Sequence, residues 1–596
     1  MVFYDFEVLK YDWLTVIIDP RLDEPYKIHN DVGALERVYR LYRREIWTGY
    51  NSTHYDQYIL KGILRGFNPK DINDYIIKAH NPGWKFDPSL RAVQLYSYDC
   101  MTRGERGLKF LEGSMGNMIK ESDVDFDIDR PLTDAEVEEM FFYCQHDVEQ
   151  TMQVFQQKKS DFDTIVYFMK HYKLPMNFIS KTKAQLAAHI LKGNRKGTNA
   201  DEMQFKRLDC VQLNRYKYIQ DWYYDHDYND TPQSVTVWGV PHVFSWGGGH
   251  GAIEKLCCEG TFVLADVGAY YPSMQTRYKL GYEVMNAPEE FEFIHNSNME
   301  FKRKGDKKAR QPFKIMDNAI TGQLKQPSSA IYCPRANNEI CNNGMMMLLD
   351  LIEHLEDATR RGELSARLIQ NNTDGILLQL YDYDRDFDVM DDIVYEWEQR
   401  TGMMMEFDTF RGKLFQKDVN NYLVMDTETG AVKAKGKWLK PKTPLDNDLP
   451  IVREALYNYM TAGAPIRDTI YKSTRLIDFQ MVCKISSKYE HLMHGAKKVK
   501  ERRLNPATGK MKTFEDFVPG QVLREKTVRV FASTESVGGL WVHAEKKSAG
   551  KYDRFTDTPD NCFMDNDDVH GKGIPPYLDR EWYVRKAEER LKSFGI

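Results

Sequence analysis

The sequence predicts a multidomain protein that combines α/β and α+β folds. Its 596 residues are too many for one hydrophobic core, so we expect three to five domains. Apolar runs with strand-like alternation are interspersed with segments of helical periodicity. Hydrophobic residues make up 42% of the chain and charged residues 29%, a balance typical of a folded, soluble protein.

The first predicted element is a strand, VFYDFEV, at residues 2–8. Its alternation projects Asp5 and Glu7 from the same face. Neighbouring carboxylates repel each other and are costly to bury without a cation. Two acids on an exposed strand face are common, so this pair gains meaning only together with other motifs.

A loop that leads into a helix is predicted at residues 49–60, GYNSTHYDQYIL. Asn51, Tyr55 and Asp56 come before the apolar run that begins the helix. On its own this pattern is an ordinary junction between a loop and a helix.

A longer helix is predicted in PLTDAEVEEMFFYCQHDVEQTMQVF. It opens with Thr133 and Glu136 in the spacing of a capping box, in which each residue satisfies a backbone N–H of the other. Tyr143 and Asp147 follow four residues apart and therefore share one face of this helix.

Two segments near the middle of the chain combine apolar patterning with polar side chains. TFVLADVGAYYPSM predicts an apolar strand that ends on Asp266 and breaks at Pro272. KIMDNAITGQLK predicts a helix that starts near Pro312 and stacks Lys314 and Asn318 on one face.

RLIQNNTDGILLQL, residues 367–380, predicts a tight hairpin of two apolar strands. Its tip carries the carboxylate of Asp374, which a turn alone does not require. Asp-Gly also makes good turns, and for an isolated hairpin that simpler explanation is sufficient.

Taken in order, these motifs resemble those of family B DNA polymerases, most closely the phage and plasmid members. The first three resemble the DxE, NxxxYD and YxxxD motifs of a proofreading exonuclease. The later three resemble the polymerase motifs DxxSLYPS, KxxxNSxYG and DTDS. The resemblance runs nearly the whole chain, and an ordered set of motifs arises by coincidence far less readily than one motif does.

The resemblance implies an RNase H-like 3′→5′ exonuclease domain followed by a right-hand polymerase. Short intervals between Asp266, Lys314 and Asp374 leave little room for the insertions of protein-primed members, so ordinary primer extension is expected. The implied domains are an exonuclease domain (1–160), a connector (161–235), a palm (236–276 and 326–440), compact fingers (277–325), and a thumb with the C-terminal region (441–596).

The resemblance also implies roles for the exonuclease residues. Hydrolysis of a phosphodiester by two divalent ions needs carboxylates around both ions and a group that orients water. Mg²⁺ or Mn²⁺, two per site, prefers such oxygen ligands. Asp5, Glu7, Asp56 and Asp147 would hold metal, Tyr143 would position the water, and Asn51 would bind the substrate strand.

The implied polymerase site also holds two metal ions, through Asp266, Asp374 and the backbone of Val267. Lys314 would bind the triphosphate of the incoming dNTP and offset charge on the leaving pyrophosphate. Tyr271 would act as a steric gate against a 2′-hydroxyl. The other implied substrate-binding residues are Asn318, Gly322, Lys302, Lys433 and Lys435, the last two in a KAKG segment whose simpler interpretation is a solvated turn.

The expected partners are primer–template DNA, dNTPs and a single-stranded DNA 3′ end, bound by a monomer. The net charge of −6 does not itself indicate a nucleic-acid binder, but basic clusters lie at 302–310, 433–442 and 497–503. FSWGGGHGA at 244–252 resembles the family's template-handling loop, where glycines admit close approach of nucleic acid. Basic residues of the thumb would grip phosphates without reading sequence.

Besides Ala269, which stands where serine is usual, three departures from the family's motifs bear on the implied polymerase site. Thr321 replaces a tyrosine beside the nascent base pair, Asn372 replaces the first acid of the hairpin motif, and in a looser alignment Asn298 replaces a fingers arginine that contacts triphosphate. The metal ligands survive, so catalysis is expected. The departures motivate a rival hypothesis, a DNA-binding relative with a decayed polymerase site that acts as a nuclease or scaffold. Tyr271 disfavours a third, an RNA-synthesising enzyme.

The cellular setting is predicted from absences in the sequence. Nine scattered cysteines without a CxxC pair argue against a zinc site or a disulfide scaffold and for a reducing compartment. The start of the chain is charged, unlike a signal peptide, and no apolar run is long enough to span a membrane. We expect a cytoplasmic protein, in the host cell if a phage encodes it.

Overall fold

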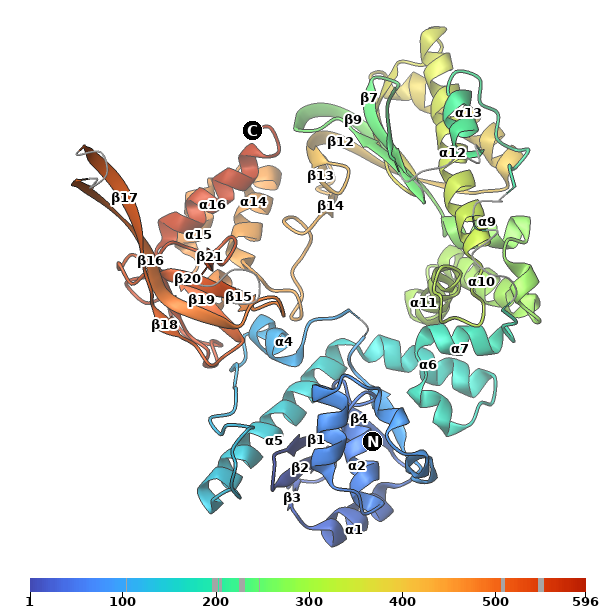
Figure 1. Ribbon diagram of the computed structural model, residues 1–596. Coiled ribbons are helices and arrows are strands. Elements are labelled where there is room, and N and C mark those ends of the chain that lie inside the picture. The colour runs from blue at the N-terminus through green and yellow to red at the C-terminus, as the bar shows by residue number, and fades with distance from the viewer. Residues whose placement is uncertain are drawn as a thin grey trace. The chain divides into compact units, whose positions relative to one another are not determined.

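The computed structural model is a mixed α/β protein of several domains (Figure 1). Its residues fall into two compact units: unit 1 comprises 1–159 and 441–589, and unit 2 comprises 160–440 and 590–596. Among the described helices, none is both long and apolar enough to cross a bilayer. The structure describes residues 1–102, 104–195, 202, 206–224, 231–245, 247–504, 510–544 and 551–596.

Unit 1 begins with a five-stranded sheet in the order β3-β2-β1-β4-β5. The central strand β1 is antiparallel to β2 and parallel to β4. Tyr4 and Phe6 of β1 enter a core with Trp47, whereas Phe3 faces the other way and packs edge-on against Phe155 of the long helix α5. Because α5 covers that second face, the alternation of β1 directs Asp5 and Glu7 into the protein rather than into solvent.

The elements of this first part agree with the predicted strand, loop–helix junction and capped helix. The capping box at α5 is confirmed: the Thr133 side chain accepts from the Glu136 N–H, and the Glu136 side chain accepts from the Thr133 N–H. The bounds are β1 Val2–Val8, β2 Trp13–Ile18, β3 Tyr26–His29, α1 Val32–Tyr42, β4 Ile46–Gly49, α2 Asp56–Leu64, α3 Pro69–Asn73, β5 Tyr96–Asp99, α4 Leu108–Met115 and α5 Asp134–Gln157.

The C-terminal part of unit 1 contains two smaller sheets, β15-β19-β22 and β17-β16-β20-β21, the second with β18 paired to β16. Helix α4 packs against β15 and β19. The fully buried Arg529 of β19 donates to the carbonyl oxygens of Gly113 at 3.1 Å and Asn117 at 2.6 Å, which ties this part to the first. The bounds are α14 Pro450–Ala462, α15 Ile466–Lys472, β15 Met481–Lys484, β16 His491–Leu504, β17 Met511–Val518, β18 Gln521–Val522, β19 Thr527–Ala532, β20 Gly539–Ala544, β21 Lys551–Arg554, β22 Cys562–Met564 and α16 Arg580–Lys592, the last of which extends into unit 2.

Unit 2 is built on a nine-stranded antiparallel sheet in the order β14-β13-β12-β9-β11-β10-β8-β7-β6. Helix α12 contacts β8, β10 and the neighbouring helix α13. The bounds are α6 Lys159–His171, α7 Lys183–Ile190, α8 Lys217–Tyr224, β6 Gln233–Val237, β7 Val240–Ser245, β8 Gly248–Ala252, β9 Leu256–Val267, α9 Tyr270–Tyr278, α10 Pro288–Arg303, α11 Lys307–Gln323, α12 Pro334–Arg360, β10 Ala366–Asn371, β11 Gly375–Leu380, α13 Tyr383–Thr401, β12 Met405–Asp418, β13 Asn421–Asp426 and β14 Val432–Lys435.

The predicted hairpin is confirmed as β10 and β11, but both proline predictions are wrong. Pro272 does not break a strand, because β9 has already ended and the proline lies in the first turn of α9, where its missing N–H costs nothing. Pro312 lies inside α11 rather than at its start. Asp306 sets that start, since its carboxylate accepts from the Ala309 N–H at 2.9 Å.

The predicted template-handling segment at 244–252 lies across the ends of two antiparallel strands, β7 and β8. Phe244 is opposite Gly249, and a Cβ at Gly249 would lie 2.6 Å from the Phe244 ring. The sulfur of Met345 on α12 is nearer still, at 2.1 Å, so packing against both Phe244 and α12 requires glycine there. Trp246, in the middle of the segment, lies outside the described residues.

Candidate active sites

The first candidate site is a cluster of buried carboxylates in unit 1. Asp5 and Glu7 project from β1 toward α5, and Asp56 begins α2. The Phe6 N–H donates to Asp56 Oδ1 at 3.1 Å, which holds the start of α2 against β1. Asp147 reaches the same cluster from α5, since the charges of Asp5 and Asp147 both raise the pKa of Glu7. The sequence motifs thus predicted side chains that the fold brings together.

Lys109 of α4 is part of this cluster, although no motif singled it out. Its ammonium forms a close ion pair with Asp147 and a second ion pair with Glu112 at 3.3 Å. It also lies 4.6 Å from the centre of the Tyr143 ring. The sequence carries no sign of this, because α4 comes between two motifs and its docking depends on the tertiary fold.

Burial dominates the acid–base behaviour of the cluster. It raises the pKa of Asp5 to about 6 and that of Asp147 to about 7, even though Lys109 lowers both. Burial, followed by the charge of Asp5, raises the pKa of Glu7 and Asp56 well above their ordinary values. The cluster therefore has more carboxylates than nearby cations can neutralise, which is a donor set that fits Mg²⁺ or Mn²⁺.

Cys144 is the third member of the tightest group, in which the ligand atoms of Asp5, Glu7 and Cys144 lie within 4.8 Å of one another. Its Sγ is 4.0 Å from Asp5 Oδ2. Burial and the Asp5 charge raise the pKa of this thiol, so it stays protonated. A protonated thiol is a poor ligand, so the carboxylates are the groups of this cluster that could hold a metal ion.

The raised carboxyl pKa values predict how the stability of the metal-free chain depends on pH. Between pH 4 and 7 the folded cluster holds protons that the unfolded chain has lost, so the free energy of unfolding falls as pH rises, by several kcal/mol at about 1.4 kcal/mol per pKa unit. Urea unfolding in EDTA at pH 5 and pH 8 measures this. The Asp5→Asn, Glu7→Gln variant is the control and should show a shallower dependence. Equal slopes in the two proteins would contradict the prediction.

Asn51 lies beside this cluster in an exposed loop, with a left-handed backbone at φ 63°. Its N–H donates to Asp99 Oδ1 at 2.8 Å, and the Thr53 N–H donates to Asp99 Oδ2 at 3.0 Å. Asp99, which follows from no sequence motif, therefore fixes the loop that carries Asn51 and leads to Asp56.

The second candidate site lies in unit 2, where β9 meets the β10–β11 hairpin. Gly375 is directly opposite Asp266 in the strand register, and the Val267 N–H donates to the Asp374 carbonyl oxygen at 2.7 Å. A Cβ at position 375 would lie 2.3 Å from Asp266 Oδ1, so only glycine fits. The Asp-Gly pair is therefore explained by the contact with Asp266 as well as by the turn.

Lys433 connects the acids of this site. Its Nζ lies 3.0 Å from Asp266 Oδ2 and 3.1 Å from Asp408 Oδ2. Burial raises the pKa of Asp266, Lys433 opposes that rise, and Asp374 adds to it. KAKG is not the solvated turn of the simpler interpretation, because Lys433 and Lys435 lie on strand β14, paired to β13.

Strand β12 adds two acids that the motifs do not contain. Asp408 binds Lys433, and Glu406 lies opposite Asp266 in the register and pairs with Lys302 of α10. Both acids follow from the pairing of β12 with β9, a contact between segments far apart in sequence. Lys302 is thereby held next to the end of β9, as a phosphate-binding role requires.

Tyr271 is half-buried close to the hairpin. Burial raises the pKa of its hydroxyl, and Cys341 and Asp374 raise it further. The predicted helix residues behave differently: Lys314, Asn318 and Gly322 are exposed on α11, and among the described contacts none joins them to Asp266 or Asp374. Their role with a nucleotide stays a prediction.

Two of the departures from the family's motifs are buried hydrogen-bonding residues. Asn298 is 2% exposed and donates to Asp317 Oδ2 at 2.8 Å, which joins α10 to α11. Its side chain is therefore engaged inside the protein, and its equivalence to a triphosphate-binding arginine stays a prediction. Thr321 is also buried and donates to Gln275 Oε1 at 2.9 Å. Asn372, by contrast, points its amide at Asp374 Oδ1, 3.4 Å away.

Comparison with known proteins gives little beyond the fold. No protein-family model matches the chain, and no curated protein matches it. Among solved structures it is similar to the family B DNA polymerase of the hyperthermophilic archaeon Pyrobaculum calidifontis, with a TM-score of 0.38 and 12% identity, over 100% of this chain and 77% of that chain. A TM-score of this size supports no conclusion about function. Any functional conclusion must therefore rest on the two candidate sites.

Proposed function

We propose that this chain is a DNA-dependent DNA polymerase of family B, of the phage type, with a 3′→5′ proofreading exonuclease. The observation that carries the proposal is the strand register of unit 2, in which Asp266 faces the hairpin of Asp374. Lys433 and Lys302 add positive charge beside these acids. The two carboxylates could hold divalent cations, and the adjacent lysines could neutralise phosphates. Together they suit a nucleotide substrate that carries several phosphates.

The polymerase residues have separable roles in this proposal. Asp266 and Asp374 would hold Mg²⁺, which activates the primer 3′-hydroxyl and stabilises the charge on the transferring phosphate. Asn372 would orient the Asp374 carboxylate through its amide. Lys433 would exchange its ion pair with Asp266 for a phosphate at the primer end, because a cation bound by Asp266 competes with it. Lys302 and Lys314 would bind the triphosphate.

The exonuclease residues would act in unit 1, on a mixed sheet that supports the RNase H-like part of the proposal. Asp5, Glu7, Asp56 and Asp147 fit a pair of divalent ions that generate the hydrolytic nucleophile. Lys109 would hold Asp147 in place, and Tyr143, whose ring centre lies 4.6 Å from the Lys109 ammonium, would position the attacking water. A second site that hydrolyses misincorporated nucleotides makes sense, because a polymerase site alone discriminates only to a limited extent between correct and incorrect nucleotides.

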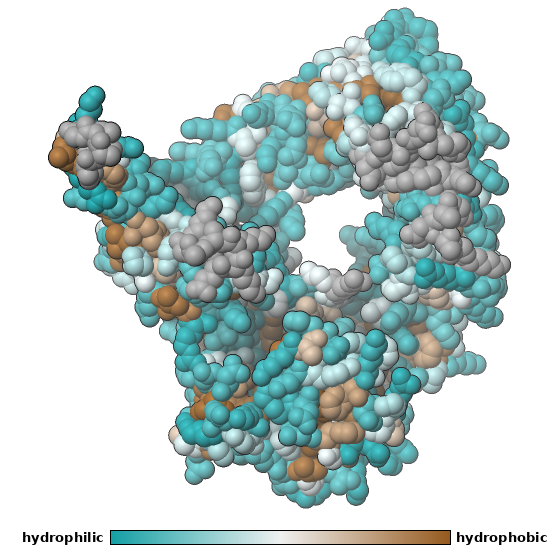
Figure 2. Space-filling model, in the orientation of Figure 1, coloured by the Kyte–Doolittle hydropathy of each residue, from teal (hydrophilic) through white to brown (hydrophobic). Residues whose placement is uncertain are grey.

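The hairpin of β16 and β17 suits the proposed grip on duplex DNA. Residues 497–504 of β16 are all exposed, and hydrophilic side chains alternate with hydrophobic patches over the hairpin (Figure 2). Lys498 and Arg503 pair with Glu515 and Asp516 across the hairpin, whereas Lys497, Lys500 and Arg502 make no ion pair among the described residues. A basic ribbon of this kind would bind phosphates without sequence preference.

The proposal is tested by incubating the chain with a primed template and Mg²⁺, with and without dNTPs. Extension is expected with dNTPs, and shortening of the primer without them. If neither extension nor shortening is observed, the proposal is refuted. Shortening alone, at every dNTP concentration, would favour the second candidate function below.

Tyr271→Ala is expected to admit ribonucleotides. The half-buried ring lies within electrostatic reach of Asp374, where it can exclude a 2′-hydroxyl. The ratio of kcat/KM for dNTP over rNTP should fall by at least about tenfold, and the Phe variant is the matched control, since it keeps the ring. Unchanged sugar selectivity in Tyr271→Ala would exclude this residue from the gate.

The second candidate function is a DNA-binding 3′→5′ exonuclease with a decayed polymerase site. The burial of Asn298 and Thr321 favours it, because neither side chain is free to contact a nucleotide. The metal-binding acids of unit 1 are unaffected by that loss.

A further inference from the structure

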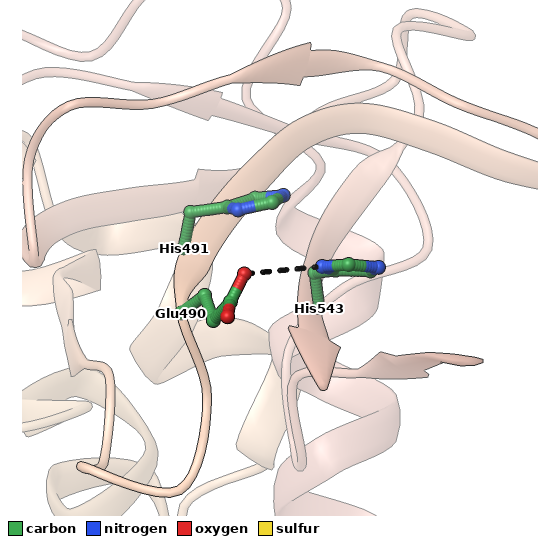
Figure 3. A group of neighbouring side chains, drawn as sticks. All are labelled: Glu490, His491 and His543. Carbon is green, nitrogen blue, oxygen red and sulfur yellow. Dashed lines mark ion pairs between the residues drawn. The ribbon is translucent and has the colours of Figure 1, made fainter. Parts of the chain in front are cut away.

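We propose that Glu490, His491 and His543 bind one divalent transition metal ion of the Zn²⁺ class. The three side chains gather between β16 and β20 (Figure 3). Their ligand atoms all lie within 4.8 Å of one another. The group shares no residue with either candidate active site, so the inference does not depend on the proposed function.

The backbone places these side chains together. His491, the first residue of β16, is directly opposite His543 of β20 in the antiparallel register. The two imidazole rings are stacked, with centroids 4.8 Å apart and an interplanar angle of 20°. The Glu490 N–H donates to the His543 carbonyl oxygen at 3.1 Å, and Glu490 Oε2 lies 3.9 Å from His543 Nδ1.

The donor set selects a different metal from the two carboxylate sites. Two imidazoles and one carboxylate are typical ligands of Zn²⁺, whereas Mg²⁺ prefers oxygen ligands only. With Zn–N and Zn–O bonds of about 2.0–2.2 Å, ligand atoms in a tetrahedral site lie roughly 3.4 Å apart. The present spacing of up to 4.8 Å is wider than this, so binding would require these side chains to rotate toward one another.

The surroundings are those of a supported site with one open side. His543 is 6% exposed, and its ring packs at 4.8 Å against Tyr552, which stacks in turn on Phe517. Glu490 keeps a third of its side-chain surface exposed, so an ion can enter from that side. Three protein ligands leave the fourth position of a tetrahedral ion to water.

A metal ion here would stabilise the base of the basic hairpin. The first half of β16 pairs with β20, and the second half continues as the exposed ribbon with β17. Cross-linking Glu490, His491 and His543 would fix the start of β16 to its neighbour and to the segment before it. The cysteine pattern could not reveal such a site, because no cysteine takes part.

The test uses the full chain, stripped with EDTA and returned to buffer with excess Mg²⁺ to occupy the carboxylate sites. Equilibrium dialysis with Zn²⁺ is expected to give one tightly held ion per chain, and Co²⁺ in its place should give the visible spectrum of a four-coordinate ion. Glu490→Gln, His491→Asn and His543→Gln should each weaken binding by at least about tenfold. His570→Asn, an exposed histidine of the same unit, is the control and should bind normally.

Thermal unfolding separates a metal site from simple ring packing. Zn²⁺ should raise the Tm of the unaltered chain and not that of Glu490→Gln. His543→Gln removes a buried ring and can lower stability by itself, so the half-exposed Glu490 gives the decisive variant. The proposal is overturned if the unaltered chain retains no Zn²⁺ beside excess Mg²⁺, or if Glu490→Gln binds Zn²⁺ as tightly.

Discussion

Replacing Asp374 by asparagine is expected to abolish primer extension and to leave the nuclease activity intact. Asp374 is exposed at the hairpin tip, so the change removes no packing. The hydrogen bond from the Val267 N–H goes to the Asp374 backbone oxygen and is retained. Only the charge that would hold metal beside Asp266 is lost, and extension should fall by at least about 10³-fold, the equivalent of several kcal/mol of transition-state stabilisation.

Gel assays of extension and of primer degradation on the same substrate measure both effects at once. Asp391→Asn is the matched control, because Asp391 is an exposed acid on α13 of the same unit. It should leave both activities unchanged. Extension by Asp374→Asn at near the normal rate would remove Asp374 from the metal site, and with it the main support for a polymerase.

The sequence predicted local structure well where short-range rules decide it. Alternation gave β1, the Asp-Gly turn between two apolar runs gave the β10–β11 hairpin, and the capping box gave the start of α5. Each of these signals depends on residues close together in the sequence. It failed at Pro312. The preference of proline for a helix start was outweighed by a cap formed six residues earlier at Asp306.

The sites were predicted in part, for a related reason. Ordered motifs identified Asp5, Glu7, Asp266 and Asp374. Lys109, Asp408 and the pair of His491 with His543 depend on contacts between elements far apart in sequence, and no short spacing encodes such contacts. Gly375 follows from both kinds of information: the local turn pattern predicted a glycine, and the tertiary contact with the Asp266 carboxylate requires one.

Asp5→Asn combined with Glu7→Gln is expected to abolish the nuclease activity, spare extension and stabilise the metal-free chain. Both replacements keep the shape of the side chain and remove a carboxylate that burial and its neighbours disfavour. In EDTA at pH 8 the free energy of unfolding should rise by about 1–2 kcal/mol. Nuclease assays in Mg²⁺ or Mn²⁺ and urea unfolding measure the two effects.

The predicted gain in stability of the double variant in EDTA distinguishes carboxylates that need a metal ion from buried polar groups that stabilise the fold. Glu112 is the matched control, because it is fully buried but pairs with a cation, Lys109 at 3.3 Å. Glu112→Gln removes the negative charge that pairs with Lys109 and should lower stability. Asp5 and Glu7 face each other as like charges, so their removal should do the reverse. If the double variant instead unfolded more easily in EDTA, these acids would be structural, and the exonuclease site would have to be sought elsewhere.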